Sequence, residues 1–433
     1  MMYGPQSRYR IYGGFSNYLS TVVEIVTGRW KTGSNVAELE AHVCKDFGVS
    51  HAIAMPMARV GIYLAIKHLI REGQKVLMSP YTIADVVNVV IAAGGTPCFV
   101  DVEPDTGNMC PDDLRKRIDR EAGAVLVTHI HGLAAEIEEI KGICDQKGIP
   151  LLEDGAQAVG ARISGKRLGC FGNAGIYSFG TYKNINAWFG GMVITSDGNL
   201  ATKMREEIAS WPYFSSQRVL KKTFSAASIT LMGWDPLFRM LVHRLFRYGF
   251  IHDVQAINRI VAIELDLSRK DVLPEHYQSR MTPGQGRLIL NQWSELDLDT
   301  KKRISSAERY ASKIQASLVL RKPPAPSGDR HVYTYYPLQC SERESLLKWL
   351  MYFHRDIAAQ HLKNCAGLES FRQFYSPCPE AERVARSVVL LPTYPRYSIE
   401  EVEANIRVVN WFEESGRPKF DLRKASQMGR LSV

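Results

Sequence analysis

The chain has 433 residues, of which 45% are hydrophobic and 23% are charged, and its formal net charge is +9. This length and composition suit two to three globular domains with a sizeable buried core. The basic residues are spread along the sequence and form no run like a nucleic-acid-binding arm, so we expect no nucleic-acid partner. A mild basic excess suits either an anionic small substrate or an acidic surface.

Eight cysteines lie far apart, at positions 44, 98, 110, 144, 170, 340, 365 and 378. None forms the close pairs that metal sites and redox motifs need, so we expect no metal site and reduced, buried thiols. The first residues lack the layout of a signal peptide, and no uninterrupted apolar run approaches membrane-spanning length. These features predict a cytoplasmic protein.

From residue 36 to residue 197, helical apolar patterns alternate with strand-like runs at 75–78, 97–102, 124–128, 150–153 and 192–195. Such alternation predicts an α/β fold with a mostly parallel sheet covered by helices. In these sheets ligands bind beyond the carboxyl ends of the strands. The residues that follow the runs are therefore the first candidates for chemistry.

Between residues 211 and 275 the sequence becomes apolar and basic, with little strand signal. Five apolar residues recur there at helical spacing, while most of the basic residues fall on another side; the apolar set is Phe238, Leu241, Val242, Leu245 and Phe246. A basic amphipathic helix of this kind usually packs on its own protein or across a dimer interface. The alternative is peripheral contact of residues 211–274 with a membrane surface.

Mixed elements follow in the last third of the chain. We expect helices at 296–316, 342–353 and 399–412 and a strand at 331–338, which together indicate a small α+β domain. The predicted organisation is an N-terminal segment (1–35), a large domain (36–210), a predominantly helical basic insert (211–275), a small C-terminal domain (276–415) and a tail (416–433).

The strand predicted at 150–153 ends in two acids, the second of which is Asp154, and a small-residue turn that contains Gln157. About thirty residues later a loop runs from Ser178 past Lys183 to a glycine pair at 190–191. No other lysine or arginine lies between residues 169 and 197, and the neighbours of Lys183 are aromatic or small. This suits an amine that is partly desolvated and so more easily neutral and nucleophilic. A lone lysine is nevertheless most often a solvated surface residue.

Taken together, segments 153–157, 178–183 and 190–191 resemble the signature of the DegT/DnrJ family of sugar aminotransferases that depend on pyridoxal 5'-phosphate (PLP). The resemblance extends to segments 30–33, 80–82, 94–101, 129–132, 165–169, 378–382 and 391–395, whereas 211–275 has no match. It implies a PLP-transferase fold of type I, like that of aspartate aminotransferase. That fold has a mostly parallel central sheet and a smaller α+β C-terminal domain.

The resemblance implies a role for four residues. Lys183 would hold PLP as a Schiff base and move the proton during amino transfer. Asp154 would pair with the pyridine nitrogen, although a carboxylate at a strand end can also cap a helix. Gln157 would lie near the 3-hydroxyl of the ring, and Ser178 would bind the cofactor phosphate.

The sequence departs from the family pattern at the phosphate loop, where Met57-Ala58-Arg59 replaces Ser/Asn-Gly-Thr. The backbone N–H of Ala58 at a helix N-terminus would still attract phosphate, and Arg59 would add a charged contact unless it is a surface arginine. Ile83 stands where the family has the aromatic residue that stacks on the ring. Tyr81, two residues earlier, is therefore the aromatic candidate for contact with the cofactor.

Two further departures concern the surroundings of the site. Trp188-Phe189-Gly190-Gly191 stands where the family has Gly-Glu-Gly-Gly, and the lost glutamate indicates a changed substrate pocket. Gln278-Ser279-Arg280-Met281 corresponds to the family's Asn-x-Arg-Met, which reaches into the site of the neighbouring subunit. Gln278 would thus contact the cofactor of a second copy, and the chain would form a homodimer.

The resemblance implies transfer of an amino group from glutamate or glutamine to the keto group of a nucleotide-linked keto-sugar, for surface-glycan or antibiotic sugar synthesis. Lys183 is retained where relatives that act as dehydratases have histidine, which favours transamination. One alternative is a ketocyclitol or another non-nucleotide acceptor. Another is a non-catalytic PLP-binding regulatory or partner protein, but the joint presence of Lys183, Asp154, Gln157 and Ser178 argues against it.

Overall fold

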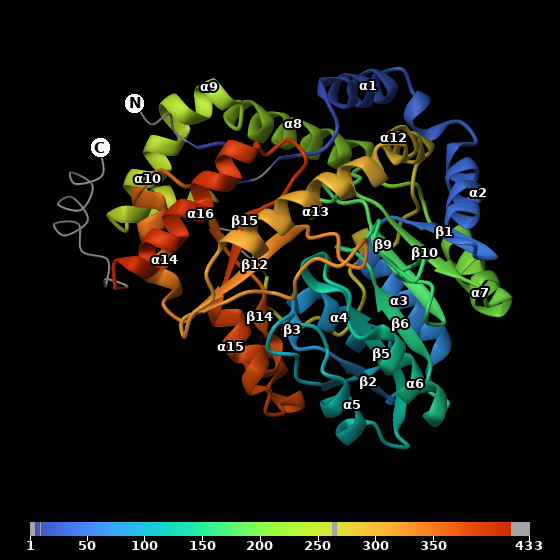
Figure 1. Cartoon of the computed structure of the whole chain (residues 1–433). Helices are drawn as coiled ribbons and strands as arrows, with labels where there is room; N and C mark the ends of the chain where they lie inside the picture. The colour runs from blue at the N-terminus through green and yellow to red at the C-terminus, as the bar shows by residue number, and fades with distance from the viewer. Residues whose placement is uncertain (1–4, 9, 262–265, 417–433) are drawn as a thin grey trace.

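A seven-stranded sheet in the N-terminal half sets the plan of the molecule (Figure 1). The computed structural model describes residues 5–8, 10–261 and 266–416. In space the strands follow the order β1 (His51–Met55), β10 (Gly191–Thr195), β9 (Ala174–Ser178), β6 (Leu151–Asp154), β5 (Ala122–Thr128), β2 (Lys75–Met78) and β4 (Thr96–Phe99). β9, β6, β5, β2 and β4 pair in parallel, while β10 runs antiparallel to its two neighbours. The predicted mostly parallel sheet is confirmed.

Helices cover both faces of this sheet because its strands are apolar along nearly their whole length. Leu126 of β5 belongs to a buried cluster with α3 and α4, whereas its neighbours Val125 and Val127 belong to another with α5 and α6. This is the alternation that a strand buried on both sides requires. The helices are α2 (Asn35–Phe47), α3 (Ala58–Leu69), α4 (Ala84–Ala92), α5 (Pro111–Arg117), α6 (Ile137–Lys147) and α7 (Gly198–Ala209).

The C-terminal part is built on a four-stranded antiparallel sheet in the order β11 (Leu320–Arg321), β12 (Tyr335–Cys340), β15 (Val388–Pro392) and β13 (Ala358–Ala359). It has a hydrophobic core of its own. Its helices are α13 (Leu296–Lys313), α14 (Arg343–Tyr352), α15 (Pro379–Ser387) and α16 (Ile399–Glu414). The predicted small α+β arrangement is therefore confirmed.

The main strand of this part begins later than expected, at Tyr335. The backbone N–H groups of Val332 and Thr334 instead donate to the carbonyls of Gly132 and His131, at 2.8 Å each. Since each N–H has one proton to donate, these residues cannot also extend the strand ladder. They tie the C-terminal part to the large sheet.

The insert consists of a chain of helices along one edge of the molecule (Figure 1). They are α8 (Ser216–Met232), α9 (Asp235–Leu237), the π-helical turn η3 (Phe238–Val242), α10 (His243–Ile251) and α11 (Gln255–Val261). α8 lies beside α1 (Phe15–Val26), where the hydroxyl oxygens of Tyr18 and Thr230 are 2.6 Å apart.

The apolar face predicted for the helix after residue 238 divides in two. Phe238 and Val242 are buried and Phe246 is half-buried, whereas Leu241 and Leu245 are 62% and 46% exposed. A π turn holds one residue more than an α turn, so it changes which side chains face inward. One edge of the face thus packs on the chain itself and the other lies open. Among the described residues, no helix combines the length and apolar character that crossing a membrane requires.

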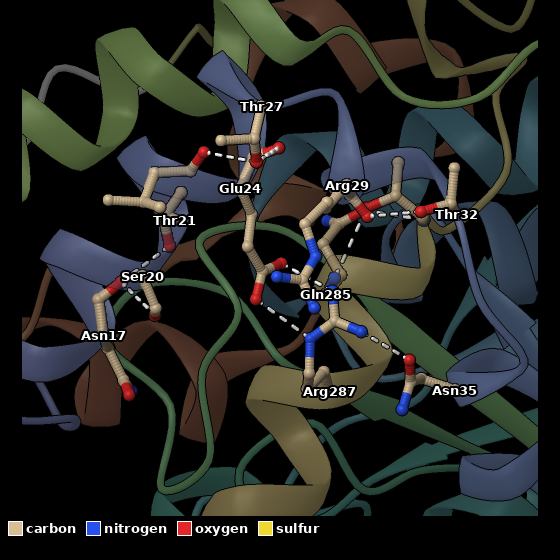
Figure 2. Close-up of polar contacts among 12 residues, drawn as sticks. Asn17, Ser20, Thr21, Glu24, Thr27, Arg29, Thr32, Asn35, Gln285 and Arg287 are labelled. Atoms are coloured by element: carbon tan, nitrogen blue, oxygen red, sulfur yellow. Dashed lines mark hydrogen bonds and ion pairs between the residues drawn. The ribbon is translucent and has the colours of Figure 1, made fainter.

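Arg287 of α12 (Pro283–Trp293) joins three helices, as Figure 2 shows. Its guanidinium donates to both carboxylate oxygens of Glu24 on α1, at 3.0 and 2.6 Å, and to Oδ1 of Asn35 on α2, at 2.6 Å. Paired bonds of this kind fix the direction of both partners. They hold α1 against the body that carries the large sheet.

Candidate active site

A cavity of about 800 Å³ is lined by residues of the large sheet, the C-terminal part and the insert. Six of the eight residues predicted to serve the cofactor line it: Ala58, Arg59, Asp154, Gln157, Ser178 and Lys183. They are far apart in the sequence, and they meet because β6 and β9 are parallel neighbours whose carboxyl ends open on the same edge.

The two acids that end β6 point in opposite directions, as alternation along a strand requires. Glu153 accepts hydrogen bonds from the backbone N–H groups of Gly169, Phe171 and Gly172, at 2.7, 2.6 and 2.7 Å. Its charge therefore holds a loop in place. Asp154 lines the cavity, so it is the carboxylate that can meet a ligand.

Burial shifts the protonation of the buried Asp154 and the half-buried Lys183 in opposite directions. It lowers the pKa of the Lys183 amine, an effect that the Asp154 carboxylate opposes and the Arg59 guanidinium reinforces. Burial raises the pKa of Asp154, while the N–H of Ala156 and the charge of Lys183 lower it. An amine that deprotonates more readily is a better nucleophile at neutral pH.

Gln157 and Ser178 are fixed at the cavity wall by local contacts. Oε1 of Gln157 accepts the backbone N–H of His131 at 3.0 Å, and its carbonyl accepts the hydroxyl of Thr334 at 2.7 Å. Oγ of Ser178 accepts the N–H of Gly180 at 3.4 Å. Because Ser178 is the acceptor in that bond, its own proton can be donated to an anion.

The N-terminus of α3 opens on the cavity without a side-chain cap. Uncapped N–H groups at a helix N-terminus are suited to a phosphate. Gly191 makes this arrangement possible, since a Cβ there would lie 2.6 Å from the backbone nitrogen of Ala58. The preceding Gly190 has a positive φ of 141°. Gln285 of α12 supports the same loop by donating to the carbonyl of Phe189 at 3.0 Å.

The guanidinium of Arg59 faces an acid. Its Nη1 forms an ion pair with Asp85 and donates to the hydroxyl of Tyr277 at 2.9 Å. Lys270 pairs with the same Asp85 at 2.9 Å. The predicted contact of the Arg59 side chain with the cofactor phosphate stays a prediction. Arg59 lines the cavity as the second residue of α3.

Two of the predicted residues do not line this cavity. Tyr81 is fully buried, and its hydroxyl lies 3.3 Å from Nε2 of His131, so the contact of Tyr81 with the cofactor stays a prediction. Thr82 and Ile83 line the cavity in its place, because Tyr81 packs inward on β3 (Tyr81–Thr82). Gln278 is exposed and lies outside the cavity. Its contact with the cofactor of a neighbouring subunit stays a prediction.

Trp188 is a wall residue that sequence reasoning did not place. Its φ of 68° is in the left-handed region, which glycine adopts freely and other residues rarely adopt. It stands where the family pattern has the first glycine of Gly-Glu-Gly-Gly. The conformation is held because Nε1 of Trp188 donates to Thr21 at 3.0 Å and its carbonyl accepts the hydroxyl of Thr181 at 3.1 Å.

Other wall residues come from segments that carried no motif. Arg218 and Lys222 of α8 line the cavity, and burial lowers the pKa of Lys222. His361 of the C-terminal part also lines it, and burial together with the charge of Lys183 lowers the pKa of this imidazole to about 4. The spacing of Arg218 and Lys222 on one helix face was the available signal, whereas His361 had none.

A carboxylate at the end of β6 and an amine in the loop after the parallel strand β9, with the N-terminus of a helix at the same cavity, are groups that a PLP-dependent aminotransferase needs. Within this class, the chain belongs to the DegT/DnrJ/EryC1/StrS aminotransferase family, whose model matches residues 16–231 and 258–410. The predicted family is thus confirmed. The unmatched stretch is residues 232–257, so the expectation that all of 211–275 lacks a match was wrong, because the model also covers 211–231 and 258–275.

Two curated relatives match most of the chain. UDP-N-acetyl-3-dehydro-alpha-D-glucosamine 3-aminotransferase of Acidithiobacillus ferrooxidans is 26% identical over 395 residues, which are 88% of this chain and 91% of the relative. The pleiotropic regulatory protein of Geobacillus stearothermophilus is 25% identical over 386 residues, 87% and 88% of the two chains. The structure of Helicobacter pylori PseC, an aminotransferase involved in the biosynthesis of pseudoaminic acid, has a TM-score of 0.70 at 20% identity. It covers 95% of this chain and 100% of that chain, which shows a shared fold.

Proposed function

We propose that this chain binds PLP in the cavity and transfers an amino group from glutamate or glutamine to the keto group of a sugar. The observation that carries the proposal is the placement of Lys183 and Asp154 in one cavity at the ends of neighbouring strands. Bound PLP supplies an electron sink for the bonds around the amino nitrogen.

The residues present fit this cofactor. Lys183 offers an amine whose pKa is lowered by burial, and Asp154 offers a carboxylate for the ring nitrogen. Gln157 would face the 3-hydroxyl. The phosphate would be held by the hydroxyl of Ser178 and the uncapped start of α3 at Ala58, with or without the Arg59 side chain.

Lys183 and Asp154 would each handle a different proton of the reaction. Nζ of Lys183 would take the proton from the α-carbon of the amino donor and return it to the cofactor carbon C4′ on the other side of the amino nitrogen, because burial lowers the pKa of this amine and so favours its acting as a base. The Asp154 carboxylate would hold the proton of the ring nitrogen. The apolar faces of Trp188 and Phe189 line the cavity and would limit access of water.

The acceptor we propose first is a nucleotide-linked keto-sugar, the class of substrate that the Acidithiobacillus relative is named for. The excess of basic residues fits a diphosphate. A second candidate is an acceptor without a nucleotide, which the apolar wall provided by the insert favours. We also propose that the chain is a homodimer in which Gln278 reaches the cavity of the partner.

The test is absorption spectroscopy of the purified chain reconstituted with PLP. We expect a visible band of bound cofactor that glutamate bleaches, and we expect neither in Lys183→Ala. Lys203→Ala, a change at an exposed lysine on α7, is the matched control and should keep both. A wild-type band that no amino donor changes would overturn transamination and favour a non-catalytic role. The Geobacillus relative is named for a regulatory function.

A further inference from the structure

The insert does more than cover the fold, since it supplies one wall of the active-site cavity. Five of its apolar side chains line the cavity, and we call them the apolar lobe: Ile229, Met232, Phe238, Val242 and Phe246. They come from α8, η3 and α10. The lobe and Lys183 belong to the same cavity, so one ligand can touch both.

The cavity side of α8 changes character along its length. Arg218, Lys222, Ile229 and Met232 are separated by four, seven and three residues, which places them within one narrow face of a helix. The face is cationic in the first half of α8 and apolar in the second. A ligand that follows this face meets positive charge and then hydrocarbon.

Charge at the two ends of this wall is unequal. Among the described residues, neither Arg218 nor Lys222 has an ion pair or hydrogen bond with a carboxylate. At the lobe, the charged groups that reach the cavity are Arg8 and Asp356, and these pair with each other at 2.8 Å. The cations of α8 are therefore available to an anion, while the lobe has little charge to offer.

We propose that the amino-group acceptor is a keto-sugar joined through a phosphate or diphosphate to a hydrocarbon chain. This proposal rests on the proposed aminotransferase function, takes its second acceptor candidate, the one without a nucleotide, and names the carrier of that acceptor. The phosphate lies against Arg218 and Lys222, and the chain fills the apolar lobe. The keto carbon then points toward Lys183.

A nucleoside fits this wall less well. A base and a ribose carry polar edges that need hydrogen-bond partners when they are removed from water. The side chains of the apolar lobe have no donor or acceptor stronger than the sulfur of Met232. Hydrocarbon loses nothing in such surroundings and gains from leaving water.

The outer surface of the insert supports the same carrier. Leu231, Trp234, Met240 and Leu241 are exposed on the insert, at 63%, 59%, 71% and 62%. α1, which lies beside α8, exposes its own apolar residues Phe15, Leu19, Val23 and Val26. A substrate with a hydrocarbon chain resides in a bilayer, and an exposed apolar surface beside the lobe suits its transfer from there.

The experiment measures binding of farnesyl diphosphate and of UDP to the PLP-loaded chain by calorimetry. We expect farnesyl diphosphate to bind at least tenfold more tightly than UDP. Met232→Glu and Phe246→Glu, two changes in the lobe at side chains that are not fully buried, should weaken farnesyl diphosphate at least tenfold and leave UDP unchanged. Leu241→Glu, which points away from the cavity, is the matched control and should change neither.

A second pair of variants tests the cationic end. Arg218→Ala and Lys222→Ala should weaken both farnesyl diphosphate and UDP, because both ligands carry a diphosphate. The proposal is overturned if UDP binds as tightly as farnesyl diphosphate or if the lobe variants bind farnesyl diphosphate as well as the wild type does.

A further outcome concerns a second copy of the chain. If Met232→Glu turns a dimer into a monomer in sedimentation velocity and the wild type does not bind farnesyl diphosphate, a partner subunit covers the lobe and the proposal fails. The spectral response to glutamate, measured on the same preparations, reports the proposed function separately. Bleaching without binding of farnesyl diphosphate would remove the hydrocarbon carrier and leave the aminotransferase.

Discussion

Neighbouring acids on β6 have separate tasks, and single substitutions should separate them. Asp154→Asn removes the carboxylate at the cavity, so we expect amino transfer to fall by about 100-fold or more. Its thermal stability should stay equal or rise, because burial raises the pKa of Asp154 and a neutral amide avoids that penalty. Melting curves and the rate of the glutamate half-reaction measure the two effects.

Glu153→Gln is the matched control for that substitution. Glu153 is fully buried and accepts three backbone N–H groups, so loss of its charge should cost about 1.5–3 kcal/mol of folding stability. If Glu153→Gln melts like the wild type, or if Asp154→Asn keeps full activity, the division of tasks is wrong.

Gly191 offers a second test at the residue scale. Gly191→Ala places a Cβ 2.6 Å from the nitrogen of Ala58, so we expect a loss of about 1–3 kcal/mol in stability and weaker PLP binding at the start of α3. Gly142→Ala on α6 is the control, because a Cβ there meets nothing within 4 Å. It should gain about 0.5–1 kcal/mol in denaturant unfolding. Equal stability of Gly191→Ala and Gly142→Ala would contradict the close approach of Gly191 to the backbone of Ala58.

Residue roles were predictable where the signal was local. Asp154 and Lys183 belong to short motifs at strand ends, and the parallel order of β6 and β9 brings them together. Whether Tyr81 would line the cavity could not be decided from the sequence, because a two-residue strand gives no periodicity from which to choose the inward side. His361 could not be foreseen, since it reaches the cavity through the packing of the C-terminal part and not through any spacing in the sequence.

At the scale of helices and strands, Arg287 of α12 holds α1 through its contact with Glu24. Arg287→Ala should cost about 1–2 kcal/mol, since it removes a paired ionic contact whose side chains are 30% and 20% exposed. Urea unfolding of Arg287→Ala, Glu24→Ala and the double variant measures the coupling. Strictly additive losses would show that the pair does not hold α1.

In the insert, hydrophobic spacing predicted that a helix forms but not what the apolar face of that helix contacts. Its spacing predicted an amphipathic helix, and helices are present at η3 and α10. The pattern could not reveal that one edge of the apolar face would line the cavity, because the same hydrophobic residues satisfy packing, a ligand or a membrane equally well. Position relative to β6 and β9 decides among these uses, and position comes from the whole fold.

At the scale of the whole molecule, buried and half-buried histidines make stability depend on pH. Burial lowers the pKa of His243 to about 4, and His131, His331, His354 and His361 are shifted in the same direction. A group whose pKa is lower in the folded state takes up protons first in the unfolded state, so stability is full above pH 6.5 and falls as pH drops toward 4.

One contribution that can be tested by itself is that of His243. It is fully buried, and among the described residues neither ring nitrogen has a hydrogen-bond partner. A shift from 6.5 to about 4 corresponds to about 3 kcal/mol. His243→Leu should therefore lose less stability than the wild type between pH 7 and pH 4.5 in urea titrations. If the free energies of unfolding of the variant and the wild type fall in parallel with pH, His243 does not cause the loss of stability.

Peripheral contact of the insert with a membrane stays a prediction about the whole molecule. Leu241→Glu/Leu245→Glu adds charge to exposed positions, so it should release the chain from anionic phospholipid vesicles in a co-sedimentation assay. Ser225→Glu, at an exposed polar position on α8, is the control for added charge. Equal sedimentation of the Leu241/Leu245 variant and the wild type would remove the predicted contact.

The π turn of η3 has a consequence for how acceptor choice can change. An α-helix advances about 100° per residue, so removing one residue from Phe238–Val242 would turn every later side chain of α10 by that amount. Phe246 would leave the cavity wall and a different neighbour would enter it, although the composition of the insert would hardly change. Acceptor preference in this enzyme can thus be altered by the phase of one helix, through a single deletion, as well as by substitution.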